Sequence, residues 1–63
     1  MNSWQSEWYH NEKGLILGSV KEYNGAYKAL LDNVFIGWFV TESYARKAVE
    51  DAFRDSLDNK RKI

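Results

Sequence analysis

The fold is decided by one short stretch, Tyr23-Asn24-Gly25-Ala26. Asn and Gly tolerate positive φ, which both central positions of a type I′ turn require. The stretch therefore predicts a two-residue β-hairpin that joins a strand of about residues 15–23 to one of about residues 26–31. The loop length also sets the register. The predicted pairs are Gly18 with Leu31, Ser19 with Leu30, Val20 with Ala29, Lys21 with Lys28, Glu22 with Tyr27 and Tyr23 with Ala26.

A second turn and a third strand follow the hairpin. Asp32-Asn33 is typical of a turn, and the apolar run from Val34 to Val40 is rich in β-branched and aromatic residues. Gly37 inside this run indicates a bulge or a close approach of another backbone.

Thr41 is predicted to cap a helix that follows the third strand. Apolar residues then recur at spacings of three and four, which places one apolar stripe against the sheet. The stripe consists of Ala45, Ala48, Val49, Ala52, Phe53 and Leu57. Arg46 and Glu50 fall on the opposite, solvated side of the helix. We therefore expect an α+β fold, a three-stranded antiparallel β-sheet packed against one carboxy-terminal α-helix.

The two ends of the chain are less defined. Residues 8–10, followed by the Gly-containing segment 11–14, are compatible with a short extra edge strand, and the path of residues 1–12 stays open. Residues 58–63 lack apolar periodicity and end in a basic cluster, so we expect them to fray. With no internal repeat and no linker, residues 1–63 are expected to form one small domain.

Composition narrows the classes of function. Nine basic and nine acidic residues cancel, so no overall field attracts the chain to phosphates or anionic lipid. No apolar run approaches the roughly 18 residues of a membrane helix, and we expect no membrane partner. The chain has no Cys, and its first residues lack the basic and apolar regions of a secretion signal, so we expect a cytoplasmic protein. Three Trp, four Tyr and three Phe exceed what a small core hides, which predicts exposed aromatic residues.

The sequence patterns that would indicate a catalytic site are weak. His10 is the only histidine, and a nucleophile would need a base held in place by a third group. Zinc sites rely on Cys and His, and the four glycines are too far apart for a phosphate-binding loop. We therefore predict a protein that is not an enzyme, with no metal, no cofactor and no small-molecule substrate.

Two patterns carry a family resemblance: Gly25-x-Tyr27-x-Ala29-x-Leu31, and Ile36-Gly37-x-Phe39-x-Thr41-x-x-x-Ala45-x-x-Ala48-Val49. Together they resemble the three-stranded sheet and helix of the plant ethylene-response-factor DNA-binding domain, of the arm-binding domains of phage-type integrases and of similar small phage proteins. The match covers less than half of the chain and consists mainly of turn glycines and core positions. The resemblance implies this fold, an origin in a phage or mobile element, and a role for the sheet face turned away from the helix.

That outward face is the predicted functional surface. Leu17, Leu30 and Phe35, with Tyr23 and Trp38, would form an apolar strip that one helix cannot cover, and such strips usually mark interfaces. We therefore predict an interaction module that binds a protein partner or a second copy through the sheet face or edge. The predicted interface residues are Leu17, Tyr23, Lys28, Leu30 and Phe35. Alternatively, Trp4 and Trp8 fold over the strip and complete a second small core.

The second hypothesis is a duplex DNA-binding accessory domain that uses the same face. Its candidate contacts are Lys13, Ser19, Lys21, Lys28, Lys60, Arg61 and Lys62. The face carries no Arg of the kind that reads bases, and few lysines to neutralise phosphates. A third reading is a single-stranded nucleic-acid binder that stacks bases on Trp8, Tyr23 or Phe35.

Overall fold

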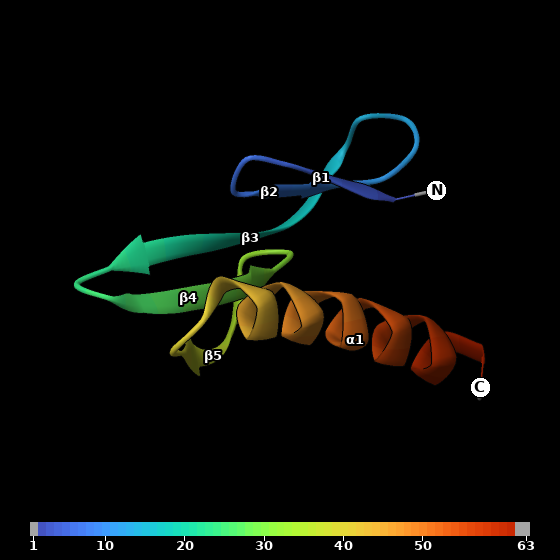
Figure 1. The fold of residues 1–63 in the computed structure, drawn as a ribbon. Coiled ribbons are helices and arrows are strands. Elements are labelled where there is room, and N and C mark those ends of the chain that lie inside the picture. The colour runs from blue at the N-terminus through green and yellow to red at the C-terminus, as the bar shows by residue number, and fades with distance from the viewer. Residues whose placement is uncertain (1, 62–63) are drawn as a thin grey trace.

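The computed structural model describes residues 2–61, and of residues 58–61 it describes the backbone alone. Its elements are β1 (Ser3–Gln5), β2 (Trp8–His10), β3 (Ile16–Tyr23), β4 (Ala26–Leu31), β5 (Val34–Phe39) and α1 (Glu42–Arg61). The strands form one open antiparallel sheet in the order β1-β2-β3-β4-β5. The helix α1 packs across one face of this sheet (Figure 1).

The α+β class is confirmed, but the expected number of three strands is wrong, because the sheet has five. Residues 8–10 do form a short strand, yet it does not lie at the edge, since β1 pairs on its outer side. The turn between β1 and β2 has Ser6 in the left-handed region at φ 57°. Strands of three residues are too short for alternation to reveal them in a sequence.

The central hairpin has the predicted turn and register. Asn24 and Gly25 have φ of 50° and 83°, as a type I′ turn requires, and all six predicted residue pairs are present between β3 and β4. The second predicted turn also has two residues in the left-handed region, Asp32 at 52° and Asn33 at 65°. Local turn chemistry therefore determines three of the five strands.

Two β-bulges change which residues face the helix. Tyr9 pairs with Gly18 and His10 with Ile16, so Leu17 is an extra residue in β3. Ala29 pairs with Gly37 and Leu30 with Phe35, so Ile36 is extra in β5, beside the glycine that indicated a bulge. Both extra residues, Leu17 and Ile36, pack against the core under the helix. The prediction that Leu17 lies on the outward face is therefore wrong.

The core lies where α1 crosses β3 and β4. Ala29, Ala45 and Val49 are completely buried, and Val20 and Tyr9 nearly so. A Cβ atom added at Gly18 would lie 2.5 Å from the carbonyl oxygen of Leu30 and 2.9 Å from Cγ1 of Val49. Small residues at this crossing therefore allow the helix to approach the sheet closely.

The helix begins as predicted and extends further than predicted. The backbone N–H of Tyr44 donates to Oγ1 of Thr41 at 3.2 Å, which confirms the cap. The backbone is helical to Arg61, so α1 includes residues 58–61, while the expected fraying of the tail stays a prediction. Over residues 2–61, no helix combines the length and the apolar character needed to cross a bilayer.

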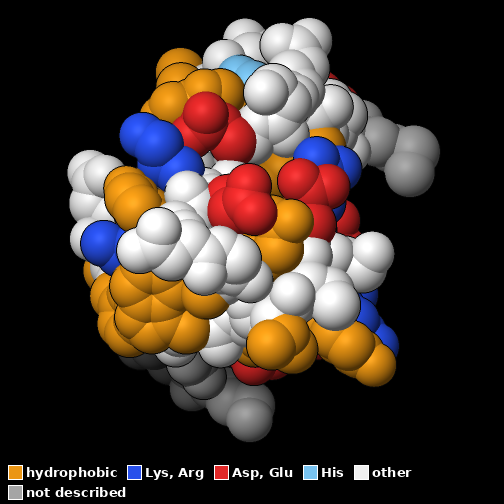
Figure 2. Space-filling model, turned by 60° about the vertical axis from the view of Figure 1, so that its left-hand side comes forward, with side chains coloured by type: hydrophobic (Ala, Val, Ile, Leu, Met, Phe, Trp, Pro, Cys, Tyr) orange, Lys and Arg blue, Asp and Glu red, His pale blue; other side chains and the backbone are white. Residues whose placement is uncertain are grey.

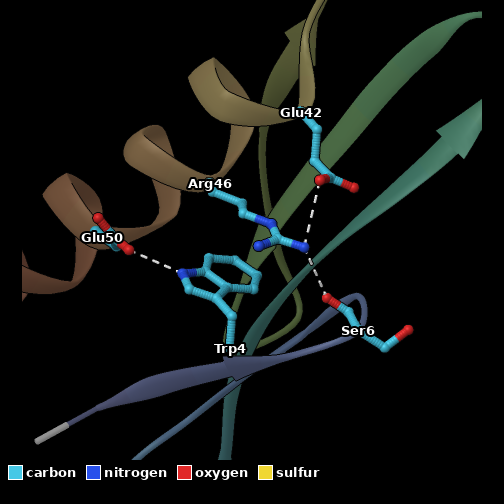
Figure 3. Close-up of polar contacts among 5 residues, drawn as sticks. All are labelled: Trp4, Ser6, Glu42, Arg46 and Glu50. Carbon is cyan, nitrogen blue, oxygen red and sulfur yellow. Dashed lines mark hydrogen bonds and ion pairs between the residues drawn. The ribbon is translucent and has the colours of Figure 1, made fainter.

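Polar contacts attach the β1–β2 hairpin to α1 (Figure 3). Arg46 lies over the ring of Trp4, with 5.0 Å from the guanidinium carbon to the ring centroid, and Nη2 donates to the carbonyl oxygen of Ser6 at 3.0 Å. The same Nη2 lies 3.4 Å from Oε1 of Glu42. The indole N–H of Trp4 donates to Oε2 of Glu50 at 2.8 Å. Arg46 and Glu50, expected on the solvated side, thus bind the amino-terminal hairpin.

Contacts between aromatic rings connect Trp4 with the core. Its ring centroid lies 4.8 Å from that of Tyr9, which in turn meets Phe53 edge-on at 6.2 Å. Trp4 therefore lies on the helix side, while Trp8 lies on the other face with 41% of its surface exposed. The alternative in which both tryptophans cover the outward strip is wrong for Trp4.

We expect Gly18→Ala to lower the free energy of unfolding by about 1–3 kcal/mol, because the added methyl group collides with the Leu30 backbone and Val49. Urea unfolding followed by circular dichroism measures this. Gly37→Ala is the matched control, because its Cβ would meet only Phe39 ring atoms at an ordinary 3.7 Å, and it should stay within about 1 kcal/mol of wild type. Equal stability of the two variants would contradict the close approach at Gly18.

We expect Arg46→Ala to lower stability by about 1–2 kcal/mol and to loosen the β1–β2 hairpin, because it removes the cation–π contact and the hydrogen bond to Ser6. Amide hydrogen exchange should accelerate in residues 3–10 and stay unchanged in β3 and β4. Lys47→Ala, at the adjacent exposed position, is the control. Unchanged exchange in residues 3–10 of the Arg46 variant would show that the contact does not hold the hairpin.

Candidate interaction surface

The sheet face opposite α1 is called here the outer face. Pairing across the strands places on it Trp8 of β2, Ser19, Lys21 and Tyr23 of β3, Lys28 and Leu30 of β4, and Phe35 and Trp38 of β5. The one helix of the described residues lies on the other side, so this face has no covering layer within residues 2–61.

Three aromatic side chains on this face form the outer aromatic cluster, defined as Tyr23, Phe35 and Trp38. The Trp38 ring lies 5.8 Å from that of Tyr23 and 6.3 Å from that of Phe35, at interplanar angles of 78° and 61°. These edge-to-face arrangements are favourable aromatic contacts. The three residues keep 46%, 51% and 53% of their surface exposed (Tyr23, Phe35, Trp38). The cluster is thus ordered by its own contacts and still open to a partner.

Two lysines lie beside the outer aromatic cluster. Lys21 and Lys28 are directly opposite each other on β3 and β4, and Nζ of Lys28 lies 5.9 Å from the centroid of the Phe35 ring. Like charges in opposite positions destabilise a sheet. No carboxylate among the side chains that the structure describes forms an ion pair with either lysine. A chain of zero net charge thus carries a local basic site on its outer face.

A shallow hollow of about 280 Å³ lies between Trp8 and Leu30 on the same face. Its lining includes the buried Ser19, with 7% of its surface exposed, and the exposed Asp32. Paired residues form a row across the strands, and in this row Leu30 lies between Ser19 and Phe35. Leu30 therefore separates the hollow from Phe35. The outer face is therefore uneven, with the hollow beside Trp8 and Leu30 and the outer aromatic cluster formed by Tyr23 of β3 and by Phe35 and Trp38 of β5.

The free edge of β5 is the second part of the surface. Sheet order leaves β5 without a neighbour on one side. Val34 and Val40, at its ends, keep 66% and 81% of their surface exposed, and Tyr44 of α1 is also exposed. An apolar hollow of about 310 Å³ lies at the carboxyl end of the strand, lined by Ala26, Trp38, Phe39, Val40 and Tyr44. No charged residue occurs from residue 33 to residue 41.

Figure 2, which brings the left-hand side of Figure 1 forward, shows hydrophobic side chains gathered on the lower left of the view. Lys and Arg side chains lie on the left and right sides of the view, and carboxylates lie mainly in its upper centre, beside smaller hydrophobic groups. An exposed apolar group of this kind is typical of a surface that contacts another molecule.

Four of the five predicted interface residues come together on the outer face: Tyr23, Lys28, Leu30 and Phe35. Leu17 packs against the core on the helix side, although it also lines the hollow beside Leu30. Val34, Val40 and Tyr44 belong to the exposed apolar surface and were missed. The uncharged run from 33 to 41 is the signal that could have identified the two valines.

The candidate nucleic-acid contacts are dispersed. Ser19, Lys21 and Lys28 share the outer face, whereas Lys13 lies in the loop between β2 and β3. Lys60 and Arg61 lie in the last turn of α1, where the structure describes only the backbone, and Lys62 lies outside the described residues. The structure therefore brings together three of the seven predicted contacts.

The single histidine lies on β2 opposite Ser3, and its Nδ1 atom is buried without a hydrogen-bond partner among the described residues. Among the side chains of residues 2–57, no three His, Asp or Glu residues are grouped as metal ligands would be. The absence of enzymatic activity stays a prediction.

Comparisons of the chain with protein-family models, with curated proteins and with solved structures find no match. The resemblance to sheet-and-helix DNA-binding domains therefore stays a prediction as well.

Proposed function

We propose that this protein is a small non-enzymatic interaction module that binds a protein partner or a second copy of itself through its outer face and the edge of β5. The observation that carries the proposal is the half-exposed outer aromatic cluster, which is continuous with the unpaired edge strand through Phe35 and Trp38.

Burial of this cluster would stabilise a complex. Apolar surface contributes about 25 cal/mol for each Å² removed from water, and Trp and Tyr are enriched among the residues that dominate interface energies. The cross-strand contacts among the three rings fix their positions before binding, so little side-chain entropy is lost on association. Lys21 and Lys28, which form no ion pair with any described carboxylate, favour a partner surface that carries carboxylates beside apolar groups.

We expect a photoreactive phenylalanine analogue at position 35 to cross-link in cells to a defined protein, because the Phe35 ring lies at the centre of the proposed surface. The same analogue at Leu15, which is also exposed but lies in the loop before β3, is the matched control. Mass spectrometry of the adduct identifies the partner, either this chain or a foreign protein. Equal labelling at both positions, or no adduct at position 35, would refute the proposal.

A second candidate function, binding of duplex DNA, is favoured by one observation. The opposed Lys21 and Lys28 cost stability in the free protein, and no described carboxylate neutralises them. Phosphates would relieve this repulsion. The same face is the one implied by the resemblance to sheet-and-helix DNA-binding domains, although it carries no Arg.

If DNA is the ligand, a titration with duplex at low salt should show binding that weakens as salt rises, with a slope of log K against log salt of about −2 for two phosphate contacts. Lys28→Gln should reduce that slope by about 1, whereas Lys47→Gln on the exposed side of α1 should leave it unchanged. No binding at low salt would remove this candidate and leave the protein-binding proposal in place.

A further inference from the structure

We propose that the partner at the β5 edge is a second copy of this chain, which pairs its own β5 antiparallel to the first and joins the two sheets into one. This inference rests on the proposed function and adds the identity of the partner, the strand that makes the contact and the register. The contact would be a two-fold one, in which the same surface of each copy meets the other.

The edge of β5 lacks the features that prevent an edge strand from pairing with a strand of another chain. Natural edge strands carry Lys, Pro or inward-pointing charges, or are very short. The six residues of β5 include none of these charges and no Pro, and its exposed side chains are apolar on both faces. The opposite edge strand, β1, has only three residues, and its exposed Ser3 and Gln5 are polar. The β5 edge is thus less protected against pairing with another chain than the β1 edge.

A β-bulge protects many sheet edges, because it twists the edge strand. The bulge in β5 instead produces a self-complementary pattern. It places Phe35 and Trp38, three residues apart, on the same outer face. A two-fold pairing that sets Phe35 opposite Trp38 of the second copy also sets Trp38 opposite Phe35. Ile36 then lies opposite Gly37 of the second copy, so the extra residue of each strand faces a position without a side chain. Aromatic pairs would repeat across the junction on the outer face.

The same register fills the apolar hollow on the other side of the edge. Val34 of the second copy would lie opposite Phe39, which lines the hollow of about 310 Å³ together with Val40 and Tyr44. Val34 is largely exposed in the single chain and is of suitable size and chemistry for this hollow. Because no charge occurs between residues 33 and 41, no like charges meet across the pair.

The available area is consistent with a weak to moderate dimer. Phe35, Trp38 and Tyr44 expose 51%, 53% and 63% of their surface. At about 150–250 Å² for a whole aromatic side chain, these three residues offer roughly 300 Å² per copy. A standard interface takes about 800 Å² from each partner, so the valines and the backbone edges would have to supply the remainder. A dimer that forms at micromolar concentration is the expected result.

The test is the mass of the full chain in solution, measured by sedimentation over a range of concentrations. Wild type should change from monomer to dimer. Val34→Lys puts a charge in place of the side chain that fills the apolar hollow, and Val40→Lys puts one among the residues that line it. Each should weaken the dimer by at least about tenfold in Kd. Leu15→Lys, the same change at a similarly exposed position away from the edge, should dimerise like wild type. Circular dichroism confirms that every variant is folded.

A wild-type protein that stays monomeric at high concentration would overturn this inference. Dimers that persist in both valine variants, or that are lost equally in the Leu15 variant, would also overturn it. The experiments distinguish a failure of this inference from a failure of the proposed function. A foreign protein cross-linked to position 35 together with a monomeric wild type would support the interaction module and refute self-pairing, whereas no adduct of any kind would refute both.

Discussion

The close approach of α1 to the sheet at Gly18 is the constraint on which the rest of the structure depends. Gly18 lies under Val49, and a single methyl group there would collide with both the helix and the neighbouring strand. Ala29 and Ala45 keep the adjoining contacts equally short. A core built from such small side chains leaves little room for the large ones. Of the ten aromatic residues, only Tyr9 therefore lies in the buried cluster, and the others pack at its margins, on the other face of the sheet or at the surface.

The margins are occupied by the amino-terminal hairpin. Trp4 and Tyr9 extend the core toward Phe53, and Arg46 joins the helix to Trp4 and to the Ser6 turn. This arrangement places the aromatic rings of β1 and β2 on different faces, with Trp4 against the helix and Trp8 on the outer face. The helix therefore covers one face of the sheet. Within the described residues, no element covers the outer face.

The outer aromatic cluster and the β5 edge meet because β5 contributes to both. Phe35 and Trp38 point to the outer face, while the free backbone edge of the same strand continues to the exposed Val40. A partner that adds a strand would gain backbone hydrogen bonds at the edge and aromatic contacts on the face. This coincidence favours strand addition over contact with the sheet face alone. The lysine pair on β3 and β4 then lies beside the junction and can discriminate among partners by charge.

Sequence alone determined the parts of this protein that depend on neighbouring residues. The Asn24-Gly25 turn and its six-pair register, the Asp32-Asn33 turn and the Thr41 cap were predictable, because backbone conformation and side-chain capping there are local. Most of the candidate surface followed from that register through strand alternation. The tertiary structure alone decided the bulge at Leu17, and it placed at Ile36 the bulge that Gly37 indicated, since an extra residue is defined by the strand it pairs with. It also decided the two short amino-terminal strands and the contacts of Arg46, because these draw their stability from residues some 40 positions away along the chain.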